Sequence, residues 1–325
     1  MVKAIVVRKT GGPEVMSFEE VEVGEPGPGE VRLRHTAIGV NFIDTYYRKG
    51  LYPAPAGLPF VPGAEAVGIV DKAGEGVVQF RPGDRVAYAG SVGAYAEARV
   101  IDSRKLVRIP DDIDGYTVAA SLLKGMTVQY LLRQTFKVTR DHSVLFHAGA
   151  GGVGQIAGQW LKSLGATSIA TVGSDEKAEI ARACGYTHVI NYRKEDFVTR
   201  VDEITGGAKC DVVYDSVGKD TFPASLDCLK PRGLFVSFGN SSGPVAEFNL
   251  GILSQKGSLY ATRPTLAHYT ATRADLDACA EDLFEQIRTG AVTISVGQKF
   301  PLAEAAACHK AMEARETVGS TLLTV

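Results

Sequence analysis

Residues 149–154, which read Gly-Ala-Gly-Gly-Val-Gly, constrain the fold more than any other segment of the sequence. This G-x-G-x-x-G string follows an apolar run at residues 144–148 and precedes a helical pattern at residues 155–164. In such a loop the first glycine allows a tight turn, the second admits a pyrophosphate, and the third lets helix and strand pack closely. The N-terminus of the helix then offers free N–H groups to an anion. Because strand and helix flank the motif, it predicts a dinucleotide-binding βαβ unit rather than a loop that serves packing alone.

Strand and helix patterns alternate after this loop. The expected strands are residues 144–148, 168–172, 188–191, 211–214 and 234–238, and the expected helices are residues 155–164 and 176–184. Strands separated by helices of this length predict a parallel sheet with right-handed crossovers.

Both ends of the chain differ from this middle part. Residues 1 to about 110 are rich in glycine and proline, and short β-type runs at 31–35, 66–70 and 85–88 lie between turn signals. A long helix is expected at residues 273–288 and a second at 302–313. We therefore expect an α/β chain: a doubly wound nucleotide domain at residues 125–266 and a mainly-β domain formed by residues 1–124 and 267–325.

Composition argues against several classes of protein. The formal net charge of −2 gives no basic footprint for nucleic acid or for an anionic membrane surface. No stretch approaches the roughly 20 apolar residues of a membrane span, and residues 1–8 lack the apolar core of a signal peptide. The cysteines are odd in number and scattered, which argues against a disulfide framework or a thiolate zinc cluster; they are Cys184, Cys210, Cys228, Cys279 and Cys308. We expect a reduced, cytoplasmic, globular protein that acts on a small molecule.

The choice of dinucleotide depends on the end of the second strand, about 20 residues after the glycine loop, where NAD enzymes place an acid. Gly173 occupies that position, followed by Ser174, and Lys177 comes one helical turn later. The room at Gly173, the hydroxyl of Ser174 and the charge of Lys177 would suit the 2′-phosphate of NADPH. Ser174 can equally cap the helix, and Asp175 and Glu176 would repel a phosphate if they turned inward. The pattern favours NADPH over NADH.

Six segments, residues 9–15, 39–46, 62–70, 146–154, 213–218 and 237–243, resemble the zeta-crystallin-like NADPH:quinone oxidoreductases, zinc-free members of the medium-chain dehydrogenase/reductase superfamily. The resemblance runs from end to end. It implies a Rossmann NADPH domain, a GroES-like catalytic domain built from both chain ends, and reduction of quinones. It also implies a homodimer joined through the nucleotide domains, for which residues 259–262 would supply an edge strand.

The resemblance also predicts that no metal is bound. Zinc alcohol dehydrogenases of the superfamily carry a ligand His where this sequence has Ala64, and a ligand Cys close to Asn41. A methyl group and an amide cannot complete a tetrahedral N/S site, and Glu65 alone is not a site.

A quinone accepts hydride readily, so the protein needs only to orient the quinone and to stabilise a developing oxyanion.

Four side chains are the candidates for substrate positioning by resemblance: Asn41, Tyr46, Tyr52 and Arg263. Each has a structural alternative, namely turn formation for Asn41, packing for the tyrosines and a surface ion pair for Arg263. The residues expected to bind the cofactor are Asn41, Thr127, Tyr130, Gly149, Gly151, Gly152, Val153, Gly154, Gly173, Ser174, Lys177, Tyr192, Ser216, Phe238, Gly239, Ser241 and Arg263. His147 lies in an apolar strand and is interpreted as structural.

Three other functions remain open. A 2-enoyl thioester reductase would share the NADPH site but would need a channel for an acyl carrier. A crystallin-like or RNA-binding protein without enzymatic activity would keep the fold, and a zinc alcohol dehydrogenase would need ligands that this sequence lacks.

Overall fold

A computed structural model describes all of residues 1–325 and divides the chain into two compact units. The mainly-β unit comprises residues 1–126, 270–288 and 294–325, and the α/β unit comprises residues 127–269 and 289–293. The division expected from the sequence gave residues 289–293 to the mainly-β domain, whereas in the structure they belong to the α/β unit. No helix of either unit is long and apolar enough to span a bilayer.

The α/β unit contains a sheet of six parallel strands in the order β10-β9-β8-β11-β12-β13. The strands are β8 (Ser143–Phe146), β9 (Thr167–Val172), β10 (His188–Asn191), β11 (Cys210–Asp215), β12 (Leu229–Ser237) and β13 (Tyr260–Thr262). The chain starts in the middle at β8, moves outward to β10, returns beside β8 and moves outward again to β13. This order confirms the expected doubly wound parallel sheet.

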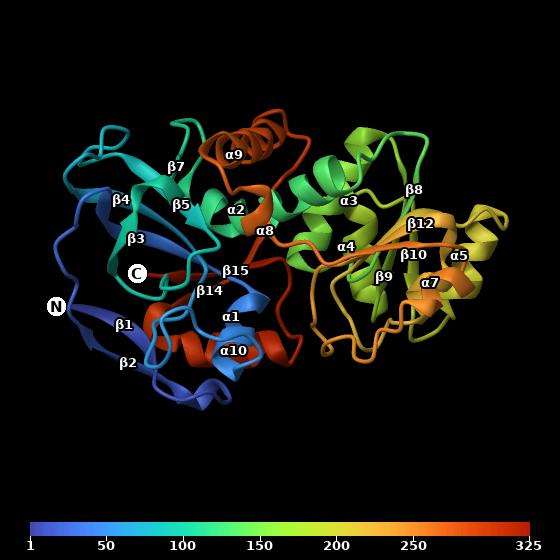
Figure 1. Cartoon of the computed structure of the whole chain (residues 1–325), viewed down its shortest axis with the longest axis horizontal. Helices are drawn as coiled ribbons and strands as arrows, with labels where there is room; N and C mark the ends of the chain where they lie inside the picture. Colours follow the sequence, from blue (N-terminus) through green and yellow to red (C-terminus); the bar gives the residue numbers. More distant parts are fainter. The chain divides into compact units, whose positions relative to one another are not determined.

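Helices cover both faces of this sheet (Figure 1). They are α3 (Gly152–Leu164), α4 (Asp175–Ala183), α5 (Phe197–Thr205), α6 (Ala224–Asp227) and α7 (Gly251–Gln255). The unit also contains the short helix α8 (Leu266–Tyr269) and a π-helical turn at Leu131–Thr135. Val201 of α5, Leu226 of α6 and Ile252 of α7 share one apolar core with the strands. Helices α3 and α4 pack against each other and against β9, on the other side of the strands in Figure 1.

The mainly-β unit is built on a seven-stranded sheet in the order β14-β15-β3-β4-β5-β7, with β6 also paired to β3, and on the hairpin β1-β2. Its strands are β1 (Val2–Val7), β2 (Met16–Val21), β3 (Glu30–Val40), β4 (Glu65–Ala73), β5 (Arg85–Ala89), β6 (Ala98–Asp102), β7 (Val107–Arg108), β14 (Val296–Pro301) and β15 (Ser320–Thr324). Its helices are α1 (Phe42–Lys49), α2 (Gly115–Tyr130, which runs into the α/β unit), α9 (Arg273–Arg288) and α10 (Ala305–Glu313), with 3₁₀ turns at Pro13–Val15, Ser103–Lys105 and Leu302–Glu304. Strand β15 pairs antiparallel with β3, so the two chain ends form one sheet, as expected.

Three differences between the structure and the elements expected from the sequence involve predicted site residues or their neighbours. Helix α1 forms where only a turn was expected, because its buried face is polar and gives no apolar periodicity. Helix α3 begins at Gly152, inside the glycine motif rather than after it. Strand β8 ends at Phe146, because Ala148 already adopts a left-handed φ of 58° at the turn.

Candidate functional site

The glycine loop joins β8 to the N-terminus of α3. Gly151 is the N-cap of this helix, and no side chain bonds to the N–H groups of its first turn. At Gly154 a β-carbon would lie 2.4 Å from the carbonyl oxygen of Ala148, so only glycine fits. Tyr186 Oη donates to the Gly154 carbonyl oxygen at 2.8 Å, and Gln155 Nε2 donates to that of Ala150 at 2.8 Å. The loop is thus held with the helix N-terminus open to an anion.

Gly173 and Ser174 at the end of β9 and Tyr192 at the end of β10 lie beside this loop, and these three residues are called the notch below. A β-carbon on Gly173 would lie 2.6 Å from Tyr192 Oη, so the phenol occupies the space that a side chain would fill. Ser174 Oγ accepts a hydrogen bond from Lys177 N at 3.3 Å and caps α4. The backbone N–H of Tyr192 donates to the carbonyl oxygen of Val172 at 3.1 Å, which fixes the two strand ends together. Gly173, Ser174 and Tyr192 therefore lie together, with the Tyr192 phenol in the room that was expected beside Gly173, and phosphate binding here stays a prediction.

The two acids next to this notch are held differently. Asp175 pairs with Lys194 at 2.5 Å and accepts from Asn191 Nδ2 at 2.9 Å, and the hydrogen bond from Lys194 keeps the pKa of this exposed carboxyl low. Asp175 is thus bound by groups of β10 and the loop after it. The Ser174 hydroxyl lowers the pKa of Glu176, so that carboxylate stays charged close to the notch.

The loops after β11 and β12 are joined to each other. Asp215 Oδ1 accepts from the N–H groups of Val217 at 2.8 Å and Gly218 at 3.0 Å, and Ser241 N donates to the Ser216 carbonyl oxygen at 3.1 Å. The backbone N–H of Phe238 also donates to the carbonyl oxygen of Asp215 at 2.8 Å, and Gly218 forms a parallel bridge with Gly243. Both loops therefore form one hydrogen-bonded rim at the carboxyl edge of the sheet.

Arg263, immediately after β13, contacts this rim. Its Nη1 donates to Ser237 Oγ at 3.1 Å and to the Gly239 carbonyl oxygen at 3.0 Å. With the side-chain amide of Asn240 in its favoured orientation, Nη2 donates to it at 3.0 Å. The expected residues of the glycine loop, the notch, the rim and Arg263 all follow strands of one parallel sheet, so they share the edge where ligands bind in doubly wound folds.

His147 lies below the loops and is fully buried. Its Nδ1 lies 2.8 Å from Thr171 Oγ1 and its Nε2 lies 3.0 Å from Ser225 Oγ, whose hydroxyl donates to Asp215 Oδ2 at 3.0 Å. Burial lowers the pKa of His147, so the ring stays neutral. His147 is a core residue that supports Asp215 and, through it, the rim.

Thr127 and Tyr130, at the end of α2, are both buried. The ring of Tyr130 stacks on Tyr269, with centroids 4.6 Å apart and planes 13° apart. Packing therefore accounts for the Tyr130 ring, and contact of either side chain with a cofactor stays a prediction.

In the mainly-β unit, Asn41 caps α1 and is almost fully buried. Its Nδ2 donates to Glu65 Oε2 at 2.8 Å, and its backbone N–H donates to Asp44 Oδ2 at 2.9 Å. The side-chain amide of Asn41 is therefore already bound to a buried carboxylate, and its contact with a cofactor or a quinone stays a prediction.

Three tyrosines cluster at the C-terminal end of α1. The Tyr52 ring makes edge contacts with Tyr46, with centroids 5.4 Å apart, and with Tyr47, with centroids 5.9 Å apart. Tyr52 N donates to the Tyr46 carbonyl oxygen at 3.2 Å, which fixes the segment against the helix. Tyr47 was not predicted from the sequence, although its position next to Tyr46 was a signal. Burial raises the pKa of Tyr47, so its phenol remains protonated.

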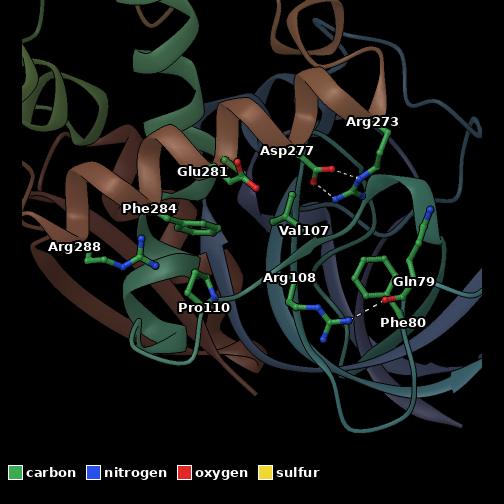
Figure 2. A pocket seen from close by; sticks show the side chains of 11 residues that line it. Gln79, Phe80, Val107, Arg108, Pro110, Arg273, Asp277, Glu281, Phe284 and Arg288 are labelled. Atoms are coloured by element: carbon green, nitrogen blue, oxygen red, sulfur yellow. Dashed lines mark hydrogen bonds and ion pairs between the residues drawn. The ribbon is translucent and has the colours of Figure 1, made fainter.

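A separate groove of about 440 Å³ lies between α9 and the segments around β7 (Figure 2). It contains none of the residues predicted from the sequence. Its arginines already have partners: Arg273 pairs with Asp277, Arg288 with Asp112, and Arg108 Nη2 donates to the Gln79 carbonyl oxygen at 2.9 Å. We assign this groove no ligand.

Two family models match the chain: the alcohol dehydrogenase GroES-like domain at residues 27–111 and the zinc-binding dehydrogenase at residues 152–283. The residues at the position of a catalytic zinc do not fit that metal. Glu65 is fully buried and accepts from Leu123 N at 2.6 Å as well as from Asn41, and the ammonium group of Lys124 lies 3.7 Å away. A carboxylate so occupied, beside a cation and the methyl group of Ala64, cannot ligate zinc. In residues 1–325 no three His, Cys, Asp or Glu side chains are grouped so that they could hold a metal.

Relatives named as enzymes match almost the whole chain. A quinone oxidoreductase of Pseudomonas aeruginosa is 56% identical over 324 residues, and a 2-haloacrylate reductase of a Burkholderia species is 49% identical over 329; each match covers 99% of both chains. The crystal structure of Escherichia coli quinone oxidoreductase complexed with NADPH superposes with a TM-score of 0.97 at 51% identity, covering 99% of this chain and 100% of that one. These matches confirm the resemblance seen in six sequence segments, and the chain belongs to the quinone oxidoreductases of the medium-chain dehydrogenase/reductase superfamily.

Proposed function

We propose that this protein reduces quinones with NADPH and without a metal. The observation that carries the proposal is the full-length similarity to quinone oxidoreductases, one of which was crystallised with NADPH. The acid-free end of β9, with Gly173 and Ser174 in place of a carboxylate, supports NADPH over NADH.

On the cofactor side, the proposed ligands line the carboxyl edge of the sheet. The free N–H groups at the start of α3 would bind the pyrophosphate, and Ser174 and Lys177 would bind the 2′-phosphate, with Tyr192 beside the adenine. The remaining proposed contacts are Asn41, Thr127, Tyr130, Gly149, Gly151, Gly152, Val153, Gly154, Gly173, Ser216, Phe238, Gly239, Ser241 and Arg263.

On the substrate side, we propose that Asn41, Tyr46, Tyr52 and Arg263 position the quinone. NADPH, when bound, supplies the hydride. The two tyrosine rings offer apolar faces for stacking, and the phenols and the guanidinium offer hydrogens to the oxygen that becomes negative. We propose that these side chains orient the quinone and stabilise the negative charge on its oxygen, and we assign no obligatory proton donor.

We further propose a homodimer in the cytoplasm. Strand β13 is at the edge of the six-stranded sheet, and Tyr260 on it is 62% exposed. Two such edges can pair across a two-fold axis, which protects an otherwise open strand. Five unpaired cysteines are consistent with a reducing compartment. Sedimentation that finds only monomer would refute the dimer.

The Burkholderia relative supports a second candidate function, the reduction of a carbon–carbon double bond next to a carbonyl group. Quinones and such alkenes both accept hydride at an electron-poor carbon conjugated to a carbonyl, so one site can serve either substrate. The 2-enoyl thioester reductase expected as an alternative uses the same chemistry. The relatives and structures described above are named as enzymes, which supports catalysis over a crystallin-like or RNA-binding role.

The test is NADPH oxidation by purified, metal-analysed protein with 1,4-benzoquinone, 2-chloroacrylate and crotonyl-CoA in parallel. Turnover with the quinone is the expected result. Turnover with only 2-chloroacrylate or only crotonyl-CoA would move the substrate assignment to the corresponding alkene and leave the cofactor site unchanged.

A further inference from the structure

A continuous chain of buried hydrogen bonds links α10 to α1 in the mainly-β unit. Arg48 Nη1 lies 3.0 Å from His309 Nδ1, His309 Nε2 lies 2.9 Å from Tyr95 Oη, and Tyr95 Oη donates to Asp44 Oδ2 at 3.0 Å. All four side chains are completely buried. Arg48 also pairs with Glu313 at 2.7 Å, which extends the chain toward the surface.

The hydrogen bonds of this chain have one consistent direction. Arg48 can only donate, so His309 Nδ1 accepts and Nε2 carries the hydrogen. The Tyr95 hydroxyl then accepts from His309 and donates to Asp44. Burial and the neighbouring Arg48 lower the pKa of His309 to about 3, so the ring is neutral and this arrangement holds at neutral pH. Every donor therefore points toward the Asp44 carboxylate.

The two oxygens of Asp44 have unequal surroundings. Oδ2 accepts two hydrogen bonds, from Tyr95 and from the backbone N–H of Asn41, whereas the buried Oδ1 has no hydrogen-bond partner. An unpartnered buried oxygen makes the charged form costly and leaves a place for a proton. Burial raises the pKa of Asp44 to about 7.

Several titratable or charged groups surround Asp44, and each comes from an element packed against it. They are Tyr47 and Arg48 of α1, Glu65 of β4, Tyr88 of β5, Tyr95 in the segment before β6, Lys124 of α2, and Cys308 and His309 of α10. Burial keeps the pKa of Tyr88 and Tyr95 above the ordinary value and raises that of Cys308 to about 12. Burial also raises the pKa of Glu65, whose carboxylate is held by Asn41, Lys124 and Leu123.

Asp44 acts on the proposed substrate site through Asn41. The carboxylate is the third residue of α1 and accepts from the N-cap N–H, where negative charge is favoured by the helix dipole. When Oδ1 takes up a proton, both hydrogen bonds to Oδ2 lose their charge assistance. The Asn41 cap and the first turn of α1, the helix that carries Tyr46, are then held less firmly.

We propose that Asp44 is a positioning residue whose ionised form fixes Asn41 and the start of α1 for quinone binding, so that the Michaelis constant for quinone falls as Asp44 loses its proton. The inference rests on the proposed quinone reductase function. It makes Arg48, His309 and Tyr95 the structural support of Asp44.

The test is the pH profile of the quinone KM and of kcat at saturating NADPH, from about pH 5.5 to about pH 8.5, for wild type and Asp44→Asn. Asparagine keeps an oxygen for the Tyr95 and Asn41 hydrogen bonds and imitates the protonated form. The wild-type KM should fall about three- to tenfold with rising pH, with a smaller change in kcat, whereas D44N should keep the high, acid-side KM throughout. Both proteins use the same cofactor, so titration of the NADPH 2′-phosphate affects the KM profiles of wild type and D44N equally.

Two further variants separate positioning from general loss of structure. Tyr95→Phe removes one donor to the carboxylate, so the midpoint of the KM profile should move to higher pH. Asp84→Asn is the matched control, because Asp84 Oδ2 also accepts a backbone N–H from three residues earlier, that of Arg81 at 3.0 Å. D84N should keep the wild-type profile; a profile flattened in D84N as well, or unchanged in D44N, would overturn the proposal.

An infrared titration provides a readout that does not need turnover. The C=O band of a protonated carboxylic acid should disappear between about pH 6 and pH 8 in the wild type and should be missing from D44N. Identical spectra of the two proteins would overturn the titration of Asp44. A wild type that shows this band but turns over no quinone would instead contradict the proposed function.

Discussion

The hydroxyl of Tyr192 lies 2.6 Å from the point where a β-carbon on Gly173 would be. Tyr192 follows β10 and Gly173 follows β9, so neighbouring parallel strands bring these two residues together. The last position of β9 is followed by Gly173 and Ser174 instead of an acidic residue, and the proposed preference for NADPH over NADH depends on this difference.

Gly173→Ala tests this notch. The added methyl must displace the Tyr192 ring, so we expect the dissociation constant for NADPH to rise about tenfold with little loss of stability. Fluorescence titration with NADPH measures it. Gly24→Ala is the control, because a β-carbon there meets nothing within 4 Å; equal affinity of G173A and wild type would contradict the placement.

Lys177→Ala tests recognition of the 2′-phosphate. Loss of a charge-assisted contact should raise the NADPH dissociation constant about tenfold and leave the NADH constant nearly unchanged. Both constants come from the same titration, so NADH serves as the internal control. Equal weakening of the two cofactors would exclude Lys177 from the phosphate site.

Tyr52→Phe tests the tyrosine cluster. Removal of the phenol, with the ring and its contacts to Tyr46 retained, should raise the quinone KM several-fold without abolishing turnover. Steady-state kinetics at saturating NADPH give both constants. Tyr116→Phe removes an exposed phenol of the same unit and should change neither; if Y52F also leaves the kinetics unchanged, the assigned role is wrong.

Acid should destabilise the protein through two buried histidines. Burial lowers the pKa of His35 to about 4 and that of His309 to about 3, so below about pH 6.5 the unfolded chain binds protons that the folded chain does not. The free energy of unfolding should therefore fall as pH decreases from about 6.5 toward 4. His309→Gln should show a shallower fall in urea unfolding than the wild type, and parallel curves would contradict a neutral His309.

Asp44 should have the opposite effect. Its pKa lies above the ordinary carboxyl value, so between about pH 4 and pH 7 the folded chain keeps a proton that the unfolded chain has lost. This contribution to stability decreases as pH rises. The stability of D44N relative to the wild type should increase from about pH 5 to pH 8 by roughly 1.4 kcal/mol per pH unit at most; a constant difference in urea unfolding would show that Asp44 does not titrate.

The sequence predicted the α/β unit well because its signals are local. A glycine string between an apolar strand and a helix, followed by alternating strands and helices, leaves few arrangements other than a doubly wound sheet. The edge strand at Tyr260–Thr262 was instead expected from the family resemblance, which implied it at residues 259–262.

The polar interior of the mainly-β unit could not be predicted. Helix α1 buries Asp44, Thr45 and Arg48, which in a sequence suggest a solvated face. The partners of Arg48 and Tyr95 on α10 lie more than 200 positions further along the chain, at His309 and Glu313. Such pairings depend on tertiary packing, and no local spacing reveals them.

The most direct test of the central claim compares kcat/KM for 1,4-benzoquinone with NADPH and with NADH, using purified protein of measured zinc content. We predict quinone-dependent oxidation of NADPH, at least about tenfold preferred over NADH, in protein without stoichiometric zinc. Absence of quinone turnover, equal use of both cofactors, or activity that requires added zinc would contradict the account.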